Sequence, residues 1–403
     1  MQAVILVRRY LKTACASIHA TRLTVLYVAV EALIHGGRLT VTGLGRALRS
    51  GTTVKHAIKR MDRLLSNGQM QGEREQIQAA LIHWILGAQP QPVIVVDWSD
   101  LTADRRWQLL RAALPVGGRA LTLYEEVHPL RRLTNPHVHR AFLRTLHRLV
   151  PAGAIPIVVT DAGFRAPWLR EVERLGWAFV GRVRNRDHVR FPEATGWVRS
   201  KSLHEHATVT PTHMGSCELV ESHPLRCQLV LVKEPRKHRI HRSRLGQPDR
   251  SSSSRKQAAG HREPWLLAVS ECLAGYQADQ LVACYRKRMQ IEEAFRDLKD
   301  ARFGVGLCLS QTTQANRFTI LLLIAALAQL GQQLLVVAVE QAVDQGHARR
   351  LLRLDLVGGH SQDPGRRFGG RRIFVDVGRV HRLRGVPRDD QRGMDHAKLV
   401  VNQ

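Results

Sequence analysis

The chain has 403 residues and a formal net charge of +27, from 61 Lys and Arg against 34 Asp and Glu. This length allows about two or three domains with a sizeable core, and the charge predicts a polyanionic partner: DNA, RNA or an anionic membrane surface. The six cysteines are scattered without a Cys-x2-Cys pair, so they suggest neither a zinc site nor a disulfide framework, and a reducing cytoplasm fits best.

Residues 1 to 88 have apolar positions at helical spacing, interrupted by glycine-containing breaks, and predict a helical region. Within it, residues 39 to 65 predict two short helices about a turn, with Thr52 or Thr53 as the N-cap of the second helix. That second helix carries Lys55, His56, Lys59, Arg60 and Arg63. The pattern fits a DNA-binding helix-turn-helix, and it also fits a plain helical bundle with a basic solvated face.

From residue 92 the periodicity changes to that of strands. The runs PVIVVDWSDLT, RRWQLLRAALPV and RALTLYEEVHP predict three antiparallel strands. A helix from Asn135 to Val150, a strand in IPIVVTDAGF, a helix from Pro167 to Leu175 and a strand in WAFVGRV follow. The predicted order is therefore β-β-β-α-β-α-β, with Asp97 ending the first strand and Asp161 ending the fourth.

The next residues, up to about 270, do not continue this pattern. Short strand-like runs, QLVLVKE and PWLLAVS, flank a basic serine-rich segment, and the second run leads back into the core. Residues 312 to 345 predict a long apolar helix, which we interpret as buried rather than membrane-spanning because glutamines interrupt its uncharged stretch. Beyond Leu356 the chain is rich in Arg and Gly, as expected of a basic DNA-clamping arm or of an unselected, out-of-frame end.

The stretch CYRKRMQIEEAFRDLKDARFG, residues 284 to 304, combines several functional side-chain types. On a single continuous helix, Tyr285, Arg288, Glu292 and Lys299 would fall within an arc of about 60°, beside an apolar stripe, while Glu293 would point away. An ordinary charged amphipathic helix would have a similar composition. A phenol, two cations and an acid on one flank instead favour a site for phosphate and metal.

The spacing Y-x2-R-x3-E-x6-K resembles the YREK signature of bacterial insertion-sequence transposases of the DDE class, in the insertion sequence four family. The resemblance implies a ribonuclease-H-like α/β core with a β-rich insertion, in which Asp97, Asp161 and Glu292 are the catalytic carboxylates. Such a set would hold two Mg²⁺ ions, or Mn²⁺, about 4 Å apart for phosphodiester cleavage. We expect Asp100 and Glu293 to be bystanders.

The same resemblance implies that Tyr285, Arg288 and Lys299 contact the DNA backbone at the transposon end. It also places Trp265 where relatives that form a DNA hairpin hold a flipped base, although an aromatic side chain beside an apolar strand is more often part of a core. We expect a helical DNA-binding region at residues 1–88, the core at 89–183 and 271–350, the insertion at 184–270, and a basic tail at 351–403.

The sequence thus predicts a cytoplasmic DNA transposase that binds terminal inverted repeats, nicks DNA with Mg²⁺ and transfers the 3′ end to target DNA. Relatives act as a dimer that joins two ends, so a homodimer on DNA, without a membrane partner, is implied. Two alternatives stay open. One is a decayed, non-catalytic DNA-binding copy, and the other is a nuclease of the same fold that does not transpose.

Overall fold

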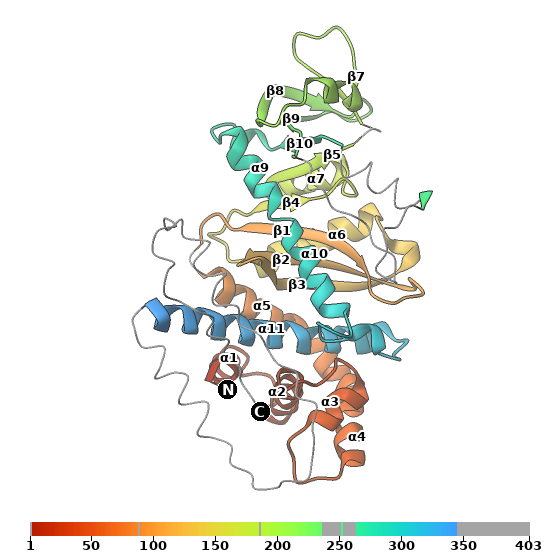
Figure 1. Ribbon diagram of the computed structural model, residues 1–403, viewed down its shortest axis with the longest axis vertical. Coiled ribbons are helices and arrows are strands. Elements are labelled where there is room, and N and C mark those ends of the chain that lie inside the picture. Colours follow the sequence, from red (N-terminus) through yellow and green to blue (C-terminus); the bar gives the residue numbers. More distant parts are fainter. Residues whose placement is uncertain (1, 88, 185–186, 236–250, 253–262, 345–403) are drawn as a thin grey trace, which may run out of the picture. The chain divides into compact units, whose positions relative to one another are not determined.

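The computed structural model describes residues 2–87, 89–184, 187–235, 251–252 and 263–344 (Figure 1). The chain divides into two compact units. One comprises the residues up to Leu64 together with the described residues from Leu323 on, and the other runs from Leu65 to Leu322. The basic tail predicted at 351–403 and most of the serine-rich segment lie outside the described residues.

The first unit contains the helices α1 (Gln2–Ala14), α2 (Ala20–Ile34), α3 (Val41–Ala47) and α4 (Val54–Leu65), and it also contains the part of α11 (Ala315–Asp344) that follows Leu322. The helices α3 and α4 form where the two short helices were predicted. They approach closely because Gly45 faces the backbone of Ile58, where an added Cβ would lie 2.6 Å from the Ile58 Cα. Thr53 precedes α4, and its Oγ1 accepts the His56 amide at 3.5 Å, as expected of an N-cap.

The second unit is built on one sheet with the strand order β3-β2-β1-β4-β5-β10-β9-β8-β6-β7. Its first half contains β1 (Val93–Asp100), β2 (Trp107–Val116), β3 (Arg119–Pro129), β4 (Ile157–Thr160) and β5 (Ala178–Val183). The helices α5 (Gly68–Leu86), α6 (Pro136–Leu149) and α7 (Ala166–Arg174) belong to this unit. The order β1-β2-β3-α6-β4-α7-β5 confirms the predicted sequence of elements, and β1, β4 and β5 are parallel as in a ribonuclease-H-like core.

The insertion continues the core sheet rather than standing apart from it. Its strands are β6 (His188–Arg190), β7 (Val198–Arg199), β8 (Thr212–Leu219), β9 (Leu225–Val232) and β10 (Trp265–Val269). Strand β10 pairs antiparallel with β5 on one side and with β9 on the other. Short 3-10 turns at Leu130–Arg132, Ser200–His206, Glu271–Leu273 and Leu307–Leu309 connect elements of this unit. The sequence predicted that the helical region ends at residue 88, whereas the first unit ends at Leu64. The difference is α5, which belongs to the second unit.

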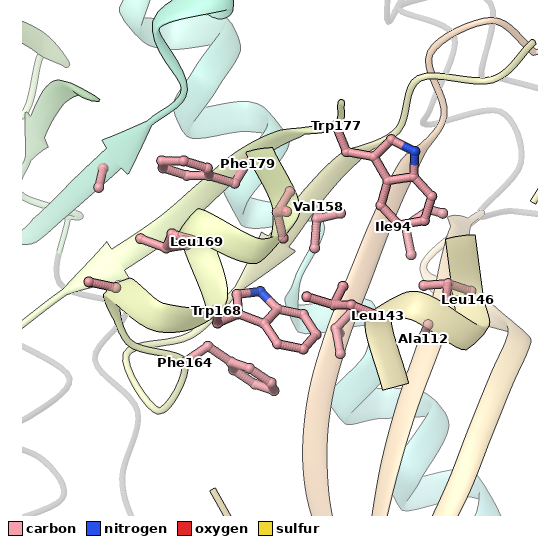
Figure 2. Packing of buried hydrophobic residues seen from close by; sticks show 14 of the residues in the cluster. Ile94, Ala112, Leu143, Leu146, Val158, Phe164, Trp168, Leu169, Trp177 and Phe179 are labelled. Carbon is pink, nitrogen blue, oxygen red and sulfur yellow. The ribbon is translucent and has the colours of Figure 1, made fainter. Parts of the chain in front are cut away.

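The two faces of the sheet are covered by different helices. Helices α6 and α7 pack on one face, and α9 (Ala278–Arg286) and α10 (Met289–Lys299) contact the strands from the other (Figure 1). Side chains alternate between the faces of a strand, so Ile94, Val96 and Trp98 face α6 and α7, whereas Val95 and Asp97 face α10. The core of this unit lies under α6 and α7. These helices, the strands and the loop before α7 contribute Leu143, Leu146, Phe164, Trp168, Leu169, Ile94 and Val158 (Figure 2).

A buried histidine of this core, His139, contacts Trp98, the residue that follows Asp97. The Trp98 indole donates a hydrogen bond from Nε1 to His139 Nε2 at 2.9 Å, and His139 stacks on Phe164. Burial, and then the nearby His128, lower the pKa of His139 to about 4. His139 is therefore neutral near pH 7, so it can accept this hydrogen bond.

The signature stretch is not the continuous helix that the sequence predicted. Helix α9 ends at Arg286 and α10 begins at Met289, so Lys287 and Arg288 form a turn between them. The amides of Lys287 and Arg288 bond to carbonyls three residues earlier, which tightens the helix locally to a 3-10 geometry. The arc calculated for an ideal helix therefore does not hold across Arg288.

Helix α11 includes the apolar stretch predicted from the sequence. By length and composition, Ala315–Leu334 could cross a membrane, and 56% of its most apolar window is buried in the structure. One such helix is weak evidence for a span, because buried helices of soluble proteins meet the same criteria.

Candidate active site

Asp97 and Asp161 lie side by side because of the register between two parallel strands. Val96 of β1 pairs with Thr160 of β4, and each acid is the next residue along its strand direction. Strand β4 ends at Thr160, so Asp161 directly follows a strand, as predicted. Strand β1 continues to Asp100, so the prediction that Asp97 ends its strand was wrong. Asp97 instead occupies the position where the parallel pairing with β4 stops.

Arg288 joins Asp97 to Glu292. Its Nη1 lies 3.1 Å from Asp97 Oδ2 and 2.7 Å from Glu292 Oε1, so one guanidinium nitrogen bridges an acid on β1 and an acid on α10. Burial, followed by the negative charge of Asp161, raises the pKa of Asp97 to about 7, while the Arg288 charge and the Trp98 amide act in the opposite direction. Asp97 and Glu292 thus share one guanidinium group, and the nearby Asp161 charge opposes the ionisation of Asp97.

A cavity of about 670 Å³ opens at this cluster. All three predicted carboxylates line it, together with Arg288 and Lys299. The Lys299 ammonium donates to Ser99 Oγ at 2.9 Å and to the Asp100 carbonyl at 3.2 Å, which ties the end of α10 to β1. Burial, as the largest cause, lowers the pKa of Lys299. Five of the seven side chains predicted for the site therefore share one cavity.

The other two predicted side chains, Tyr285 and Trp265, pack against each other instead of lining the cavity. Their rings meet edge to face with centroids 4.9 Å apart. Tyr285 is buried, burial raises the pKa of its phenol, and its ring lies 5.9 Å from the Arg288 guanidinium carbon. In this arrangement the Tyr285 ring packs beside the Arg288 guanidinium group, and Trp265 is half-buried beside Tyr285.

The two acids expected to be bystanders make ion pairs of their own. Asp100 pairs with Arg105, and Glu293 pairs with Arg296 three residues later on α10. Neither is among the residues that line the cavity. Asp300, one residue beyond α10, does line it.

A buried ion pair under the site was missed in the sequence. Arg111 is the neighbour of Asp97 across β1 and β2, and Glu125 is the neighbour of Arg111 across β2 and β3. The Arg111 guanidinium binds Glu125 Oε2 through Nε at 2.8 Å and Nη2 at 2.7 Å, and both side chains are almost fully buried. Arg111 also lies 5.3 Å from the ring centre of Phe295 on α10. The available signal was charge inside two apolar strand runs, Arg111 in the first and the adjacent Glu125 and Glu126 in the second.

The donor set fits hard divalent cations, although in the described part of the chain no three acidic, histidine or cysteine side chains are already grouped as a metal site. Carboxylate oxygens are the ligands that Mg²⁺ and Mn²⁺ take in proteins. Burial first, and then the Asp161 charge, raise the pKa of Asp97, and a bound cation would stabilise the charged carboxylate against both. Arg288 supplies positive charge to Asp97 and Glu292 in this structure.

The fold is that of an α/β protein with a ribonuclease-H-like core. Two neighbouring parallel strands lead to adjacent acids, a helix facing them carries a third acid, and helices cover both faces of the sheet. Residues 88–328 match the family model described as a transposase DDE domain, which is more than half of the chain. The chain therefore belongs to this family of DDE transposases. Family members generally use divalent metals.

Two further comparisons add little. No curated protein matches the chain. Among solved structures, the chain is similar to a piggyBac transposase in a synaptic complex with hairpin DNA, with 11% identity over 92% of this chain and 85% of that chain, at a TM-score of 0.39. A likeness at that TM-score is too weak to support an inference about site or substrate.

Proposed function

We propose that this DDE transposase binds the terminal inverted repeats of a bacterial insertion sequence, nicks the DNA at their ends and joins the exposed 3′ end to target DNA. The observation that carries the proposal is the meeting of Asp97, Asp161 and Glu292, from two parallel strands and a facing helix, around one cavity that also contains Arg288 and Lys299. This is the donor set that two-metal phosphodiester cleavage needs.

In this proposal each side chain has a defined task. Asp97, Asp161 and Glu292 would hold the divalent ions, with Mg²⁺ as the expected metal and Mn²⁺ as a substitute. Such ions, when bound, activate a hydroxyl nucleophile and stabilise the charge on the leaving oxygen. Arg288 and Lys299 would then bind the scissile phosphate, because a guanidinium and an ammonium group both form charge-assisted hydrogen bonds to phosphate oxygens.

The aromatic pair has a supporting task in the same proposal. Tyr285 would keep Arg288 in place, since its ring lies beside the guanidinium group and its side chain is buried. Trp265 would reach DNA only by leaving its edge-to-face contact with Tyr285. A flipped base at Trp265 therefore requires a rearrangement of that contact, and the resemblance to the insertion sequence four family remains its sole support.

The critical test is magnesium-dependent cleavage of DNA that carries the inverted repeats bordering the gene. We expect Asp97→Ala, Asp161→Ala and Glu292→Ala each to lower cleavage by about 10³-fold or more, because a metal ligand is worth several kcal/mol of transition-state stabilisation. DNA affinity measured without metal should change little, since basic groups elsewhere supply most of it.

Glu293→Ala and Asp100→Ala are the matched controls, because they remove acids that pair outside the cavity. Both variants should cleave like the wild type. Loss of cleavage in Glu293→Ala with retention in Glu292→Ala would show that the acid on α10 was assigned wrongly. A wild-type protein without cleavage would favour a decayed copy, and cleavage without preference for the repeats would favour a non-transposing nuclease.

We also propose that α3 and α4 bind DNA and that the protein works as a homodimer on DNA in the cytoplasm. Lys55, Lys59 and Arg63 are exposed on α4, whereas Ala57, Met61 and Leu64 are buried, so one face of this helix is available to a polyanion. Replacing the three basic residues by Gln should reduce the slope of log affinity against log salt by about 2 to 3.

The control for α4 removes the same number of charges from the other unit, through Lys201, Arg226 and Lys233 to Gln, all exposed. Fluorescence anisotropy with a short repeat-containing duplex gives both slopes. An equal effect of the two triple variants would reduce α4 to generic positive charge. Sedimentation of the protein with and without the duplex tests the dimer.

A further inference from the structure

One aromatic side chain, in a loop whose first residue lines the cavity, is almost fully exposed, and the proposed chemistry does not use it. Among the described large apolar side chains that are exposed, Phe303 has the greatest exposed fraction, 82%. It follows α10 by four residues, and Asp300, at the start of the same loop, lines the cavity. An isolated exposed Leu or Val needs no explanation, but a Phe with this exposure, three residues after a side chain that lines the candidate active site, does.

The loop is built to hold Phe303 in place. Asp300 Oδ1 accepts the Arg302 amide at 2.7 Å and the Phe303 amide at 2.5 Å. The next residue, Gly304, packs so tightly on the end of α10 that an added Cβ would lie 1.9 Å from the Asp297 carbonyl oxygen. The Val305 amide then donates to that same carbonyl at 2.8 Å. The backbone on both sides of Phe303 is thus anchored to the helix that carries Glu292.

The charge around Phe303 suits a nucleic acid. The Arg302 guanidinium carbon lies 5.0 Å from the centre of the Phe303 ring, and the ring keeps most of its exposure despite this contact. Lys299 lies on the same chain segment and lines the cavity. An aromatic ring with a cation at its face, close to further basic side chains such as Lys299, is a combination on which proteins stack the bases of unpaired nucleic acid strands.

We infer that Phe303 is a base-stacking residue, which receives an unpaired DNA base next to the phosphate positioned at Asp97, Asp161 and Glu292. The inference rests on the proposed function, since it places DNA in the same cavity. It differs from the expected contact at Trp265, because Trp265 packs on Tyr285 at the α9 end of the stretch, whereas Phe303 follows the end of α10. The base comes either from the transposon end or from the target DNA.

The test uses two short duplexes of one sequence, one fully paired and one with mismatched bases at one end, where a 2-aminopurine reports stacking. Binding is measured without divalent metal, so cleavage does not interfere. Wild-type protein should bind the frayed duplex more tightly and quench its 2-aminopurine fluorescence. Phe303→Ala should reduce the preference for the frayed duplex by about 5- to 100-fold, while affinity for the paired duplex, which is set by charge, changes by about twofold at most.

Two conservative variants separate stacking from loop stability. Phe303→Trp should keep the preference and the quenching, whereas Phe303→Leu should lose both although it stays apolar. Val209→Ala removes another exposed apolar side chain, with an exposed fraction of 67%, and should behave like the wild type. Equal preference for the frayed duplex in the wild type and in the Ala and Leu variants would overturn the inference.

Two further measurements identify the source of the base and test whether Phe303 instead joins two copies of the chain. A repeat-end duplex and an unrelated target duplex, each frayed, distinguish transposon end from target by which one loses affinity in Phe303→Ala. Sedimentation without DNA would overturn the inference if Phe303→Ala dissociated a dimer and left base preference intact, because the residue would then join two copies. Plasmid cleavage by the wild type and by Asp97→Ala tests the proposed function separately, so its failure is distinct from the failure of base stacking.

Discussion

The two faces of the sheet differ in what β1 and β4 contribute to them. On the face covered by α6 and α7, these strands contribute Val96 and Val158 to an apolar core. On the face under α9 and α10, β1 contributes Asp97, and β4 leads to Asp161. The first face contains three large, fully buried aromatic side chains, those of Phe142, Trp168 and Phe179. The second contains a row of charges across three neighbouring strands, formed by Asp97, Arg111 and Glu125.

The difference teaches where the stability and the chemistry of this unit reside. Burying apolar area gives roughly 25 cal/mol per Å², so the α6/α7 face is a source of folding free energy. Burying carboxylates and guanidinium groups carries a desolvation penalty that ion pairing only partly offsets. We therefore expect changes on the first face to alter stability and changes on the second to alter activity, and three predictions test this division.

The largest effect on stability is expected on the apolar face. Phe142 is fully buried on α6, with its ring 5.0 Å from Tyr124 and 6.5 Å from Trp168. Phe142→Ala should lower the free energy of unfolding by about 3–5 kcal/mol, because the loss of transfer free energy adds to that of the cavity. Denaturant titration followed by tryptophan fluorescence measures this change.

The control on the same unit is Leu130→Ala, whose side chain is 47% exposed and should leave stability within about 0.5 kcal/mol. Cleavage per folded molecule should be unchanged in Phe142→Ala at temperatures below its transition. A Phe142→Ala variant with wild-type stability and reduced cleavage would break the division between the two faces.

The buried pair Arg111–Glu125 tests the charged face. Glu125→Gln leaves the Arg111 charge without its partner and should destabilise the protein by about 3 kcal/mol, since an uncompensated buried charge is strongly unfavourable. The double variant Arg111→Met with Glu125→Leu removes both charges and should restore most of that stability.

Activity should not return with stability in the double variant. Arg111 neighbours Asp97 across the strands and lies over Phe295 of α10, so it helps to place the helix that carries Glu292. We expect reduced cleavage and weaker Mn²⁺ binding by calorimetry in the stable double variant. Full cleavage with full metal affinity would show that the pair is only a structural feature of the sheet.

The sequence was sufficient for those parts that depend on local pattern. Continuous apolar runs gave the core strands, and the acid after IVVT lay beside Asp97 because two parallel strands in register carry their next residues together. The three acids were found because Asp97 and Asp161 each follow a buried run and Glu292 lies in a spaced signature. Helix periods and breaks likewise located α3, α4, α6 and α7.

Features that depend on long-range packing escaped. The residues of Trp265–Val269 do not by themselves indicate that β10 pairs with β5, because an apolar strand of this kind could pair with several other strands. The turn at Lys287 and Arg288 contains no Gly or Pro, and its tight geometry aims Arg288 at Asp97, 191 positions earlier in the chain. Arg111 and Glu125 meet only after β2 and β3 pair, so the residues next to each of them in the sequence do not indicate the ion pair. The exposure of Phe303 follows from the loop anchored at Asp300, which periodicity does not describe.

The smallest effect concerns single phosphate contacts at the cavity. Arg288→Ala and Lys299→Ala should each lower cleavage about 10- to 100-fold, because a charge-assisted contact contributes about 1.5–3 kcal/mol, while affinity for the repeat duplex falls much less. Lys287→Ala should retain cleavage, since Lys287 is exposed and does not line the cavity. Cleavage of a pre-nicked repeat duplex at one salt concentration compares the three variants.

Stability in the same three variants separates the role of Arg288 from generic charge. Arg288 bridges Asp97 and Glu292, so its removal leaves the carboxylates to repel one another until a cation binds. Arg288→Ala should therefore melt at a lower temperature without metal and gain more from added Mg²⁺ than the wild type does. Lys299 bonds only to Ser99 and the Asp100 carbonyl among the described contacts, so Lys299→Ala should show the wild-type response to Mg²⁺. Equal cleavage losses and equal Mg²⁺ responses in all three variants would mean that the charged face contributes positive charge without a defined site.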